Sequence, residues 1–273
     1  MVSNVCYLIA LFGLAALALH DADAGTARRA LLYLTLFPSA LFLFAGYAES
    51  LFLALAIWCI VALRRRPWLF AGFLGLLASL TRQMGLFLVL PFIWEYGSSI
   101  GWRLRRLRPD ALAVLLIPTG LLIFMAWLWR TLGDPLAFVH AERHWNHHFA
   151  LPWQTLITAL QRLPALPDPI FRFAGTVDLF AIVLVAVLIV IGARRMLAGD
   201  TAYTVAIWLL VVCYPTASWP LQSDARYMLL AFPALLLLAR LGHRPWLNTV
   251  VLTVFGLLLL LMTQYFVRGG LIL

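Results

Sequence analysis

The chain has 273 residues, of which 64% are apolar and only 11% are charged. Soluble domains contain about 45–50% apolar and about 25% charged residues, so the composition excludes a soluble globular protein. It predicts an all-α polytopic membrane protein, with residues 1–273 forming a single integral-membrane domain. The net charge of +9 does not indicate a nucleic-acid-binding protein, because the arginines are clustered between apolar runs.

These basic clusters are expected to mark the cytoplasmic loops. They are Arg28-Arg29, Arg64-Arg65-Arg66, Arg103 with Arg105, Arg106 and Arg108, Arg194-Arg195, and Arg240 with His243 and Arg244. We interpret the acids of these loops, Asp21, Asp23 and Asp200, as ordinary loop residues. Three cysteines, Cys6, Cys59 and Cys213, lie inside apolar runs and have no metal-ligand spacing, so we interpret them as small core residues.

With the basic clusters on one side, the apolar runs alternate across the membrane and predict about ten crossings. In chain order they are Asn4–Leu19, Arg29–Gly46, Leu51–Leu63, Trp68–Leu80, Met84–Trp94, Asp110–Leu132, Thr176–Ala193, Ala202–Tyr214, Tyr227–Leu238 and Trp246–Phe266. A long outer loop is expected over residues 133–175. It contains two amphipathic stretches, Leu136–Trp145 and Trp153–Leu163.

Two polar islands, Tyr47–Ser50 and Thr81–Gln83, interrupt the nearly continuous apolar stretch from Ala30 to Trp94. An ionisable side chain in the bilayer core costs roughly 2.5–3.5 kcal/mol on insertion scales, which makes each island a candidate functional site. The runs around the islands are too short to cross a core of about 30 Å, so the turns are expected to dip below the outer surface. Irregular backbone at that depth is tolerated where it lines a wet cavity, which predicts a pocket open to the outer side.

The predicted outer side also gathers most of the remaining candidate groups. An acid, several imidazoles and two arginines facing one vestibule would suit a phosphate-bearing substrate. Two simpler readings stay open: Glu49 and Arg82 could form a structural ion pair, and Arg226 could be an interfacial arginine that extends its head group into water. Four histidines (His140, His144, His147 and His148) have a spacing that suggests zinc, but no suitable carboxylate or cysteine completes the set, and we expect no metal.

Two segments resemble a known enzyme family. Phe37-Pro38, Phe42, Tyr47 and the run Glu49–Phe52 match the pattern FPxxxFxxxxYxESLF of the membrane mannosyltransferases that add the second mannose in GPI-anchor assembly, and of their bacterial relatives. The segment Ala78–Gly85 looks like the LTRxxG element of that family. Weaker similarities follow at Gly133–Phe138 with His140 and Trp145, and at Arg226-Tyr227 with Phe232-Pro233.

The resemblance implies a GT-C type glycosyltransferase of the bacterial-type inner membrane with its site on the outer face. Such an enzyme transfers a sugar, typically mannose, from a polyprenyl-phosphate donor to a glycan, lipid or protein acceptor. Membrane lipid and the donor would be its partners, and no cofactor is implied. The donor-binding residues would be Tyr47, Glu49, Arg82, Arg226 and His140. Transfer would be inverting: a carboxylate takes the acceptor proton, and arginines hold the phosphate leaving group.

The chain departs from the family pattern in one respect. In these enzymes the catalytic acid lies in the first outer loop, after a first span, whereas this chain begins at what resembles the second span. We therefore expect an N-terminal truncation or an inactive relative, and leave the catalytic residue unassigned. A non-catalytic protein that binds or moves polyprenyl-phosphate lipids is the alternative. A small-molecule transporter would require midplane sites and repeat symmetry, and neither is visible in the sequence.

Overall fold

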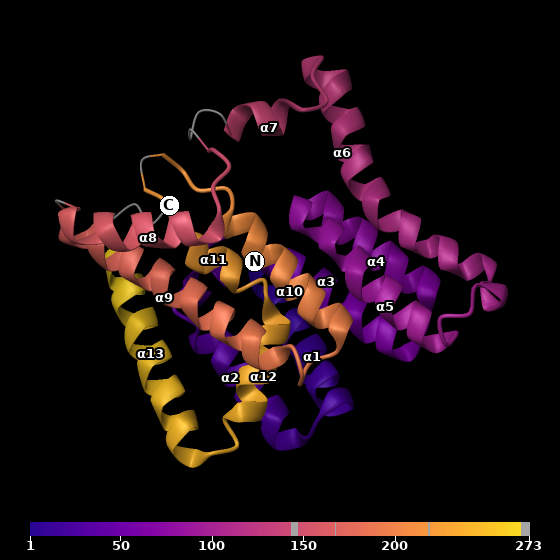
Figure 1. The fold of residues 1–273 in the computed structure, drawn as a ribbon, viewed down its shortest axis with the longest axis horizontal. Helices are drawn as coiled ribbons and strands as arrows, with labels where there is room; N and C mark the ends of the chain where they lie inside the picture. Colours follow the sequence, from indigo (N-terminus) through magenta and orange to yellow (C-terminus); the bar gives the residue numbers. More distant parts are fainter. Residues whose placement is uncertain (143–146, 167, 218, 269–273) are drawn as a thin grey trace.

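The computed structural model describes residues 1–142, 147–166, 168–217 and 219–268 (Figure 1). These residues form helices and contain no β-strand; His147 and Thr216 make one isolated β-bridge. The α-helices are α1 (Val2–Asp21), α2 (Ala24–Leu36), α3 (Glu49–Arg65), α4 (Trp68–Thr81), α5 (Val89–Ser99), α6 (Leu116–Leu132), α7 (Ala137–Glu142), α8 (Pro152–Arg162), α9 (Pro169–Gly192), α10 (Ala198–Val212), α11 (Asp224–Met228), α12 (Phe232–Leu241) and α13 (Pro245–Val267). Short 3-10 helices join them: η1 (Ala40–Leu43), η2 (Gln83–Leu88), η3 (Leu104–Arg106), η4 (Pro109–Leu115) and η6 (Leu163–Ala165).

Four helical segments in the described chain are long and apolar enough to cross a membrane. They are Val2–Asp21, Pro109–Leu132, Pro169–Gly192 and Pro245–Val267, while α4, α10 and α12 are apolar but shorter. The structure thus confirms an all-α protein with helices suited to a bilayer. Ten separate crossings stay a prediction.

Several predicted boundaries were wrong because local backbone chemistry ends or starts helices inside the apolar runs. The run Arg29–Gly46 is not one helix: α2 ends at Leu36, since the residue before Pro38 is driven to an extended conformation. The run Tyr227–Leu238 is divided between α11 and α12. Helix α9 begins at Pro169 rather than Thr176, with Asp168 accepting a hydrogen bond from the amide of Ile170 (2.7 Å) as its N-terminal cap.

The predicted long loop is correspondingly shorter and contains the two expected helices in part. Helix α8 follows the predicted stretch Trp153–Leu163 closely, whereas α7 covers only Ala137–Glu142. Residues 143–146, which complete the other stretch, lie outside the described residues. In Figure 1, α7 and α8 lie at the same end of the molecule, away from the start of α13.

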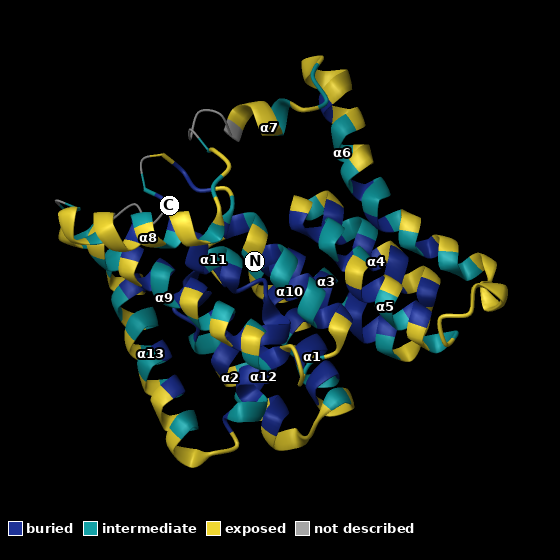
Figure 2. Cartoon of the chain, viewed as in Figure 1, coloured by how far each residue is buried: buried dark blue, intermediate teal, exposed yellow. Residues whose placement is uncertain are grey.

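The core is centred on α12, where every residue from Phe232 to Ala239 is buried (Figure 2). Helix α12 packs on α2 and α9, while α3 packs on α1 and α4. Helices α6 and α13 present mostly exposed or half-buried surface, including Leu122 and Leu260. Apolar surface of this extent is typical of helices that face lipid.

Helix α6 joins the rest of the molecule mainly through α4, and glycines allow this contact. A Cβ atom at Gly72 on α4 would overlap the carbonyl oxygen of Ala113, and one at Gly120 on α6 would overlap the carbonyl oxygen of Leu76. The two backbones therefore approach more closely than any larger residue would permit, as in other membrane helix pairs.

Replacing Gly120 with alanine should loosen this contact. We expect Gly120→Ala to destabilise the protein by about 1–3 kcal/mol, because the added methyl group meets backbone atoms that cannot move aside. Thermal unfolding in detergent, followed by a thiol-reactive dye that reports exposure of Cys6 and Cys59, would measure the change. Gly256→Ala on α13 is the matched control: its Cβ has open space, so the same substitution should be neutral or stabilising by about 0.5–1 kcal/mol.

Candidate functional site

Glu49 is an almost completely buried carboxylate at the start of α3, with a residue exposure of 1%. Its Oε1 accepts a hydrogen bond from Nη1 of Arg82 (2.5 Å) and lies 3.2 Å from Nε of Arg226, an ion-pair distance without hydrogen-bond geometry. Its Oε2 has no hydrogen-bond partner within the described residues. One carboxylate thus holds two arginines that are 144 positions apart in the chain (226 − 82).

Both arginines lie where the long helices are interrupted. Arg82 follows the last residue of α4 in an extended conformation (φ −150°, ψ 140°), which turns its side chain out of the helical path before η2 begins. Arg226 lies on the short helix α11, between an irregular segment and α12. Polar backbone breaks inside apolar sequence are therefore what allow these charged side chains to meet Glu49.

Aromatic rings surround the two guanidinium groups. The Cζ atom of Arg226 lies 5.4 Å from the ring centre of Phe42, 5.5 Å from that of Tyr47 and 5.1 Å from that of Tyr227. Arg82 contacts the same Tyr227 ring, with its Cζ atom 5.2 Å from the ring centre. Nη2 of Arg226 also donates to the Tyr227 hydroxyl (3.2 Å). We call Phe42, Tyr47, Glu49, Arg82, Arg226 and Tyr227 the Glu49 cluster.

The Glu49 cluster carries an excess positive charge. Two guanidinium groups face one carboxylate, and the side chains of Arg82 and Arg226 keep exposures of 18% and 15%. Cation–π contacts cover the ring-facing surfaces of the arginines but leave their N–H edges for other partners. Such edges match the oxygens of a phosphate group, so the cluster is chemically suited to an anionic ligand.

The structure brings together four of the five predicted donor-site residues. Tyr47, Glu49, Arg82 and Arg226 meet in the Glu49 cluster, whereas His140 lies on α7. There Nδ1 of His140 is 2.6 Å from the carboxylate of Asp134, and both side chains are largely exposed. The ion pair between Glu49 and Arg82, one of the alternatives that the sequence left open, is present. It is compatible with a binding role, because Arg226 shares the same carboxylate.

Two buried acids next to the cluster did not stand out in the sequence. Asp178 on α9 accepts hydrogen bonds from the amides of Ser223 (3.2 Å) and Ala225 (2.8 Å), so its carboxylate spans the residue between them, Asp224. Asp224 is 7% exposed, and its Oδ2 has no hydrogen-bond partner among the described residues. Burial, and then the neighbouring Asp178, raise the pKa of Asp224 well above its ordinary value. The available signal was an aspartate inside the apolar run Thr176–Ala193.

At the other end of α3, the interpretation of Asp21 and Asp200 as ordinary loop acids was wrong. Arg64 is buried and contacts three carboxylates, those of Asp21 (3.4 Å), Glu95 (2.6 Å) and Asp200 (2.5 Å). Sequence position alone placed Arg64 in a solvated basic loop. Only the packing of α1, α5 and α10 around the end of α3 shows that it is the centre of a buried network.

Two cavities occur elsewhere in the described residues. One of about 290 Å³ lies beside the Arg64 network, and one of about 740 Å³ lies between the loop after α5 and the α3–α4 turn. Neither is lined by a residue of the Glu49 cluster, so the predicted outer pocket stays a prediction. No grouping of the described His, Cys, Asp and Glu residues has a geometry that could hold a metal ion.

Removing the charge of Glu49 should destabilise the fold. In Glu49→Gln the two arginines keep their positions without a counter-charge, and breaking a buried ion pair on one side costs about 3–5 kcal/mol. Thermal unfolding in detergent would measure this loss. Glu95→Gln is the matched control, because Arg64 retains two other carboxylates, and we expect a change below about 1 kcal/mol. Equal effects of the two substitutions would contradict the importance of the Glu49 charge.

The chain matches no protein-family model, no curated protein and no solved structure. A role for the Glu49 cluster therefore has to be argued from its own residues. These provide an aromatic-lined pair of arginines that share one carboxylate, next to two buried acids, in a protein whose helices suit a bilayer.

Proposed function

We propose that this chain is a membrane glycosyltransferase that uses a polyprenyl-phosphate sugar, with mannose as the sugar, and that the Glu49 cluster binds the donor phosphate. The proposal includes the ten-crossing topology, with the cluster facing the outer side of a bacterial-type inner membrane. The acceptor would be a glycan, lipid or protein. His140 pairs with Asp134 on another part of the chain than the Glu49 cluster, so we assign it the least direct part in binding.

One observation carries the proposal: a single buried carboxylate holds two arginines from distant parts of the chain. Oriented guanidinium groups bind phosphate through paired N–H bonds and lose little side-chain entropy when they do so. The same groups stabilise the negative charge that develops on a phosphate leaving group. Sugar transfer from a lipid phosphate requires this stabilisation. The apolar helices around the cluster suit the polyprenyl chain.

In this reaction the acceptor hydroxyl oxygen forms a bond to the anomeric carbon, and the bond from that carbon to the phosphate oxygen breaks. A carboxylate accepts the hydroxyl proton, and the polyprenyl phosphate leaves with the bonding electron pair. We keep Glu49 as a positioning group rather than the base, because its Oε1 already holds both arginines. We assign Asp224 the role of base for testing, because its Oδ2 has no hydrogen-bond partner among the described residues and its raised pKa gives the ionised carboxylate a high proton affinity.

The same geometry favours a second candidate, a protein that binds or moves polyprenyl-phosphate lipids without transferring a sugar. Both arginines are held by Glu49, and Asp178 is engaged by two backbone amides. A site whose nearest acids are engaged in this way can hold a phosphate and still lack a proton acceptor. Binding and transfer therefore have to be measured separately.

The test uses the purified chain in lipid vesicles with radiolabelled polyprenyl-phosphate mannose. We expect Arg82→Gln and Arg226→Gln to weaken donor binding at least about tenfold, since loss of one charged hydrogen-bonding group removes 1.4 kcal/mol or more. Arg130→Gln, the same change at an exposed arginine on α6, should bind as the unchanged protein does. Sugar transfer to co-reconstituted membrane lipids and glycans is followed in parallel.

Three results separate the candidates. Transfer that is lost in Asp224→Asn while donor binding is retained supports the glycosyltransferase and its assigned base. Binding that depends on Arg82 and Arg226 without any transfer favours the lipid-binding alternative. Donor binding that is absent, or equal in the cluster variants and in Arg130→Gln, would overturn both.

A further inference from the structure

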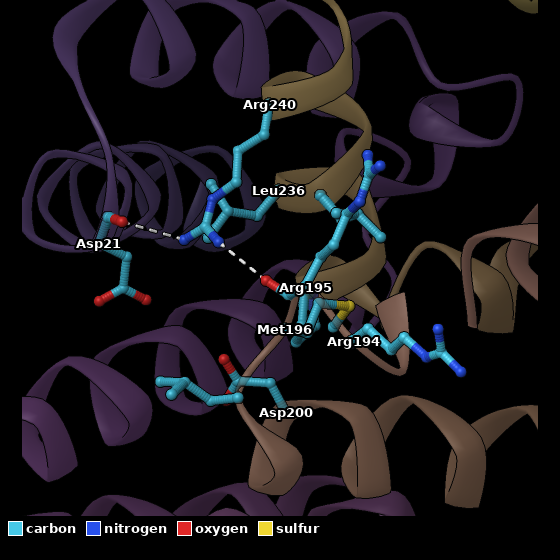
Figure 3. Close-up of a pocket in the computed structure, with 10 residues that line it drawn as sticks. Asp21, Arg194, Arg195, Met196, Asp200, Leu236 and Arg240 are labelled. Carbon is cyan, nitrogen blue, oxygen red and sulfur yellow. Dashed lines mark hydrogen bonds between the residues drawn. The ribbon is translucent and has the colours of Figure 1, made fainter. Parts of the chain in front are cut away.

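A second site lies at the opposite end of α3 from the Glu49 cluster. Fifteen residues separate Glu49 from Arg64 (64 − 49), a distance of about 22 Å along a helix. Beside Arg64, the end of α1, one side of α12, the start of α10 and the turn between α9 and α10 line a cavity of about 290 Å³ (Figure 3). Its lining residues are Asp21, Arg194, Arg195, Met196, Leu197, Asp200, Pro233, Leu236, Leu237 and Arg240.

Asp200 lines this cavity, and one oxygen of its carboxylate lacks a donor. Asp200 is 6% exposed; its Oδ2 accepts from Nη2 of Arg64, while its buried Oδ1 has no hydrogen-bond partner within the described residues. The three hydrogen bonds of Arg64 go to Asp21, Glu95 and Oδ2 of Asp200, and none reaches Oδ1. Three carboxylates around one guanidinium leave an excess of negative charge. A buried acceptor in this state favours a ligand with several N–H donors and a positive charge.

On the facing wall, the guanidinium group of Arg240 has no negatively charged partner within the described residues. Arg240 reaches from α12 between Asp21 and Arg195 and donates only to their backbone carbonyl oxygens, at 3.2 and 3.5 Å (Figure 3). Its buried Nε has no hydrogen-bond partner among the described residues. The exposed side chains of Arg194 and Arg195 add positive charge at the rim. These bonds to neutral carbonyls leave the guanidinium charge of Arg240 available for an anion.

We propose that this cavity binds a phosphoethanolamine group, with the ammonium on Oδ1 of Asp200 and the phosphate on Arg240 and the rim arginines. A primary ammonium has N–H donors that can bind the unpaired oxygen of Asp200, whereas a quaternary ammonium has none. A plain phosphate would face Asp200 without compensation. Met196, Leu236 and Leu237 supply apolar surface for the carbon atoms of the ligand, and the cavity lies at the small end of the usual range for ligand sites, roughly 300–1,000 Å³.

The position of the cavity makes a lipid head group one source of this chemistry. The basic clusters at this end, including Arg28-Arg29 and Arg194-Arg195, are typical of the cytoplasmic membrane surface, where head groups are abundant. A soluble phosphoethanolamine ester is the other source. The site is independent of the Glu49 cluster, so neither its presence nor its absence bears on sugar transfer.

The test compares head groups that differ only in their ammonium. The purified chain is placed in nanodiscs of phosphatidylethanolamine or phosphatidylcholine with the same fraction of phosphatidylglycerol, and its thermal unfolding is followed. We expect the midpoint to be about 2–4 °C higher with the primary amine, since a ligand that binds the folded state stabilises it. Glycerophosphoethanolamine and glycerophosphocholine, added to the protein in detergent, form the soluble arm.

Variants connect the selectivity to the cavity. Asp200→Asn should abolish the difference between the two head groups, and Arg240→Gln should reduce stabilisation by the amine lipid. Arg28→Gln, an exposed arginine at the same end but outside the cavity, should leave the difference unchanged. If Asp200→Asn fails to fold, native mass spectrometry of the unchanged protein after mild delipidation supplies a second readout, in which we expect phosphatidylethanolamine to be retained over phosphatidylcholine.

Selectivity in the nanodisc arm alone identifies a lipid head group as the ligand, and selectivity in the soluble arm shows that the head group suffices. Equal unfolding midpoints in both arms would overturn the proposal. So would a selectivity that persists unchanged in Asp200→Asn, because the ammonium would then bind elsewhere.

Discussion

Charges buried in an apolar protein have to be paired, and in this chain α3 has a paired, buried charge at each of its ends. Glu49 at its start holds Arg82 and Arg226, and Arg64 near its end holds acids from α1, α5 and α10. Removing one partner of a buried pair costs about 3–5 kcal/mol, which is a large part of the stability of a typical domain. Helix α3 therefore fixes the positions of its neighbours through charge as much as through packing.

The sequence predicted the Glu49 cluster because polar residues stand out within an apolar run. Tyr47, Glu49 and Arg82 could be selected on that ground, and Arg226 by its place between predicted spans. The Arg64 network could not be predicted in this way. Asp200 is 136 positions from Arg64, and each residue lies in a segment where charged loop residues are common. Pairing of that kind depends on how helices pack, and hydropathy contains no information about it.

Fold class and the longest spans followed from composition, while helix ends did not. Hydropathy treats Phe37-Pro38 as a continuation of the apolar run, whereas the proline restricts the preceding residue and α2 ends. His140 was grouped with the cluster because the predicted topology placed both on one side of the membrane. Being on one side does not bring residues into contact, and Asp134 is the partner that local sequence supplies to His140.

The charge balance of the Glu49 cluster limits what it can do chemically. The carboxylate of Glu49 acts as a positioning group, because its Oε1 is engaged by Arg82 and Arg226 together. A phosphate that enters would compete with Glu49 for the same N–H groups and would be held by the charge in excess. Proton transfer then requires a different acid, and the buried pair of Asp178 and Asp224 next to Arg226 is where the described structure offers one. In the proposed reaction, proton transfer thus depends on Asp224, two residues before the arginine that would hold the phosphate.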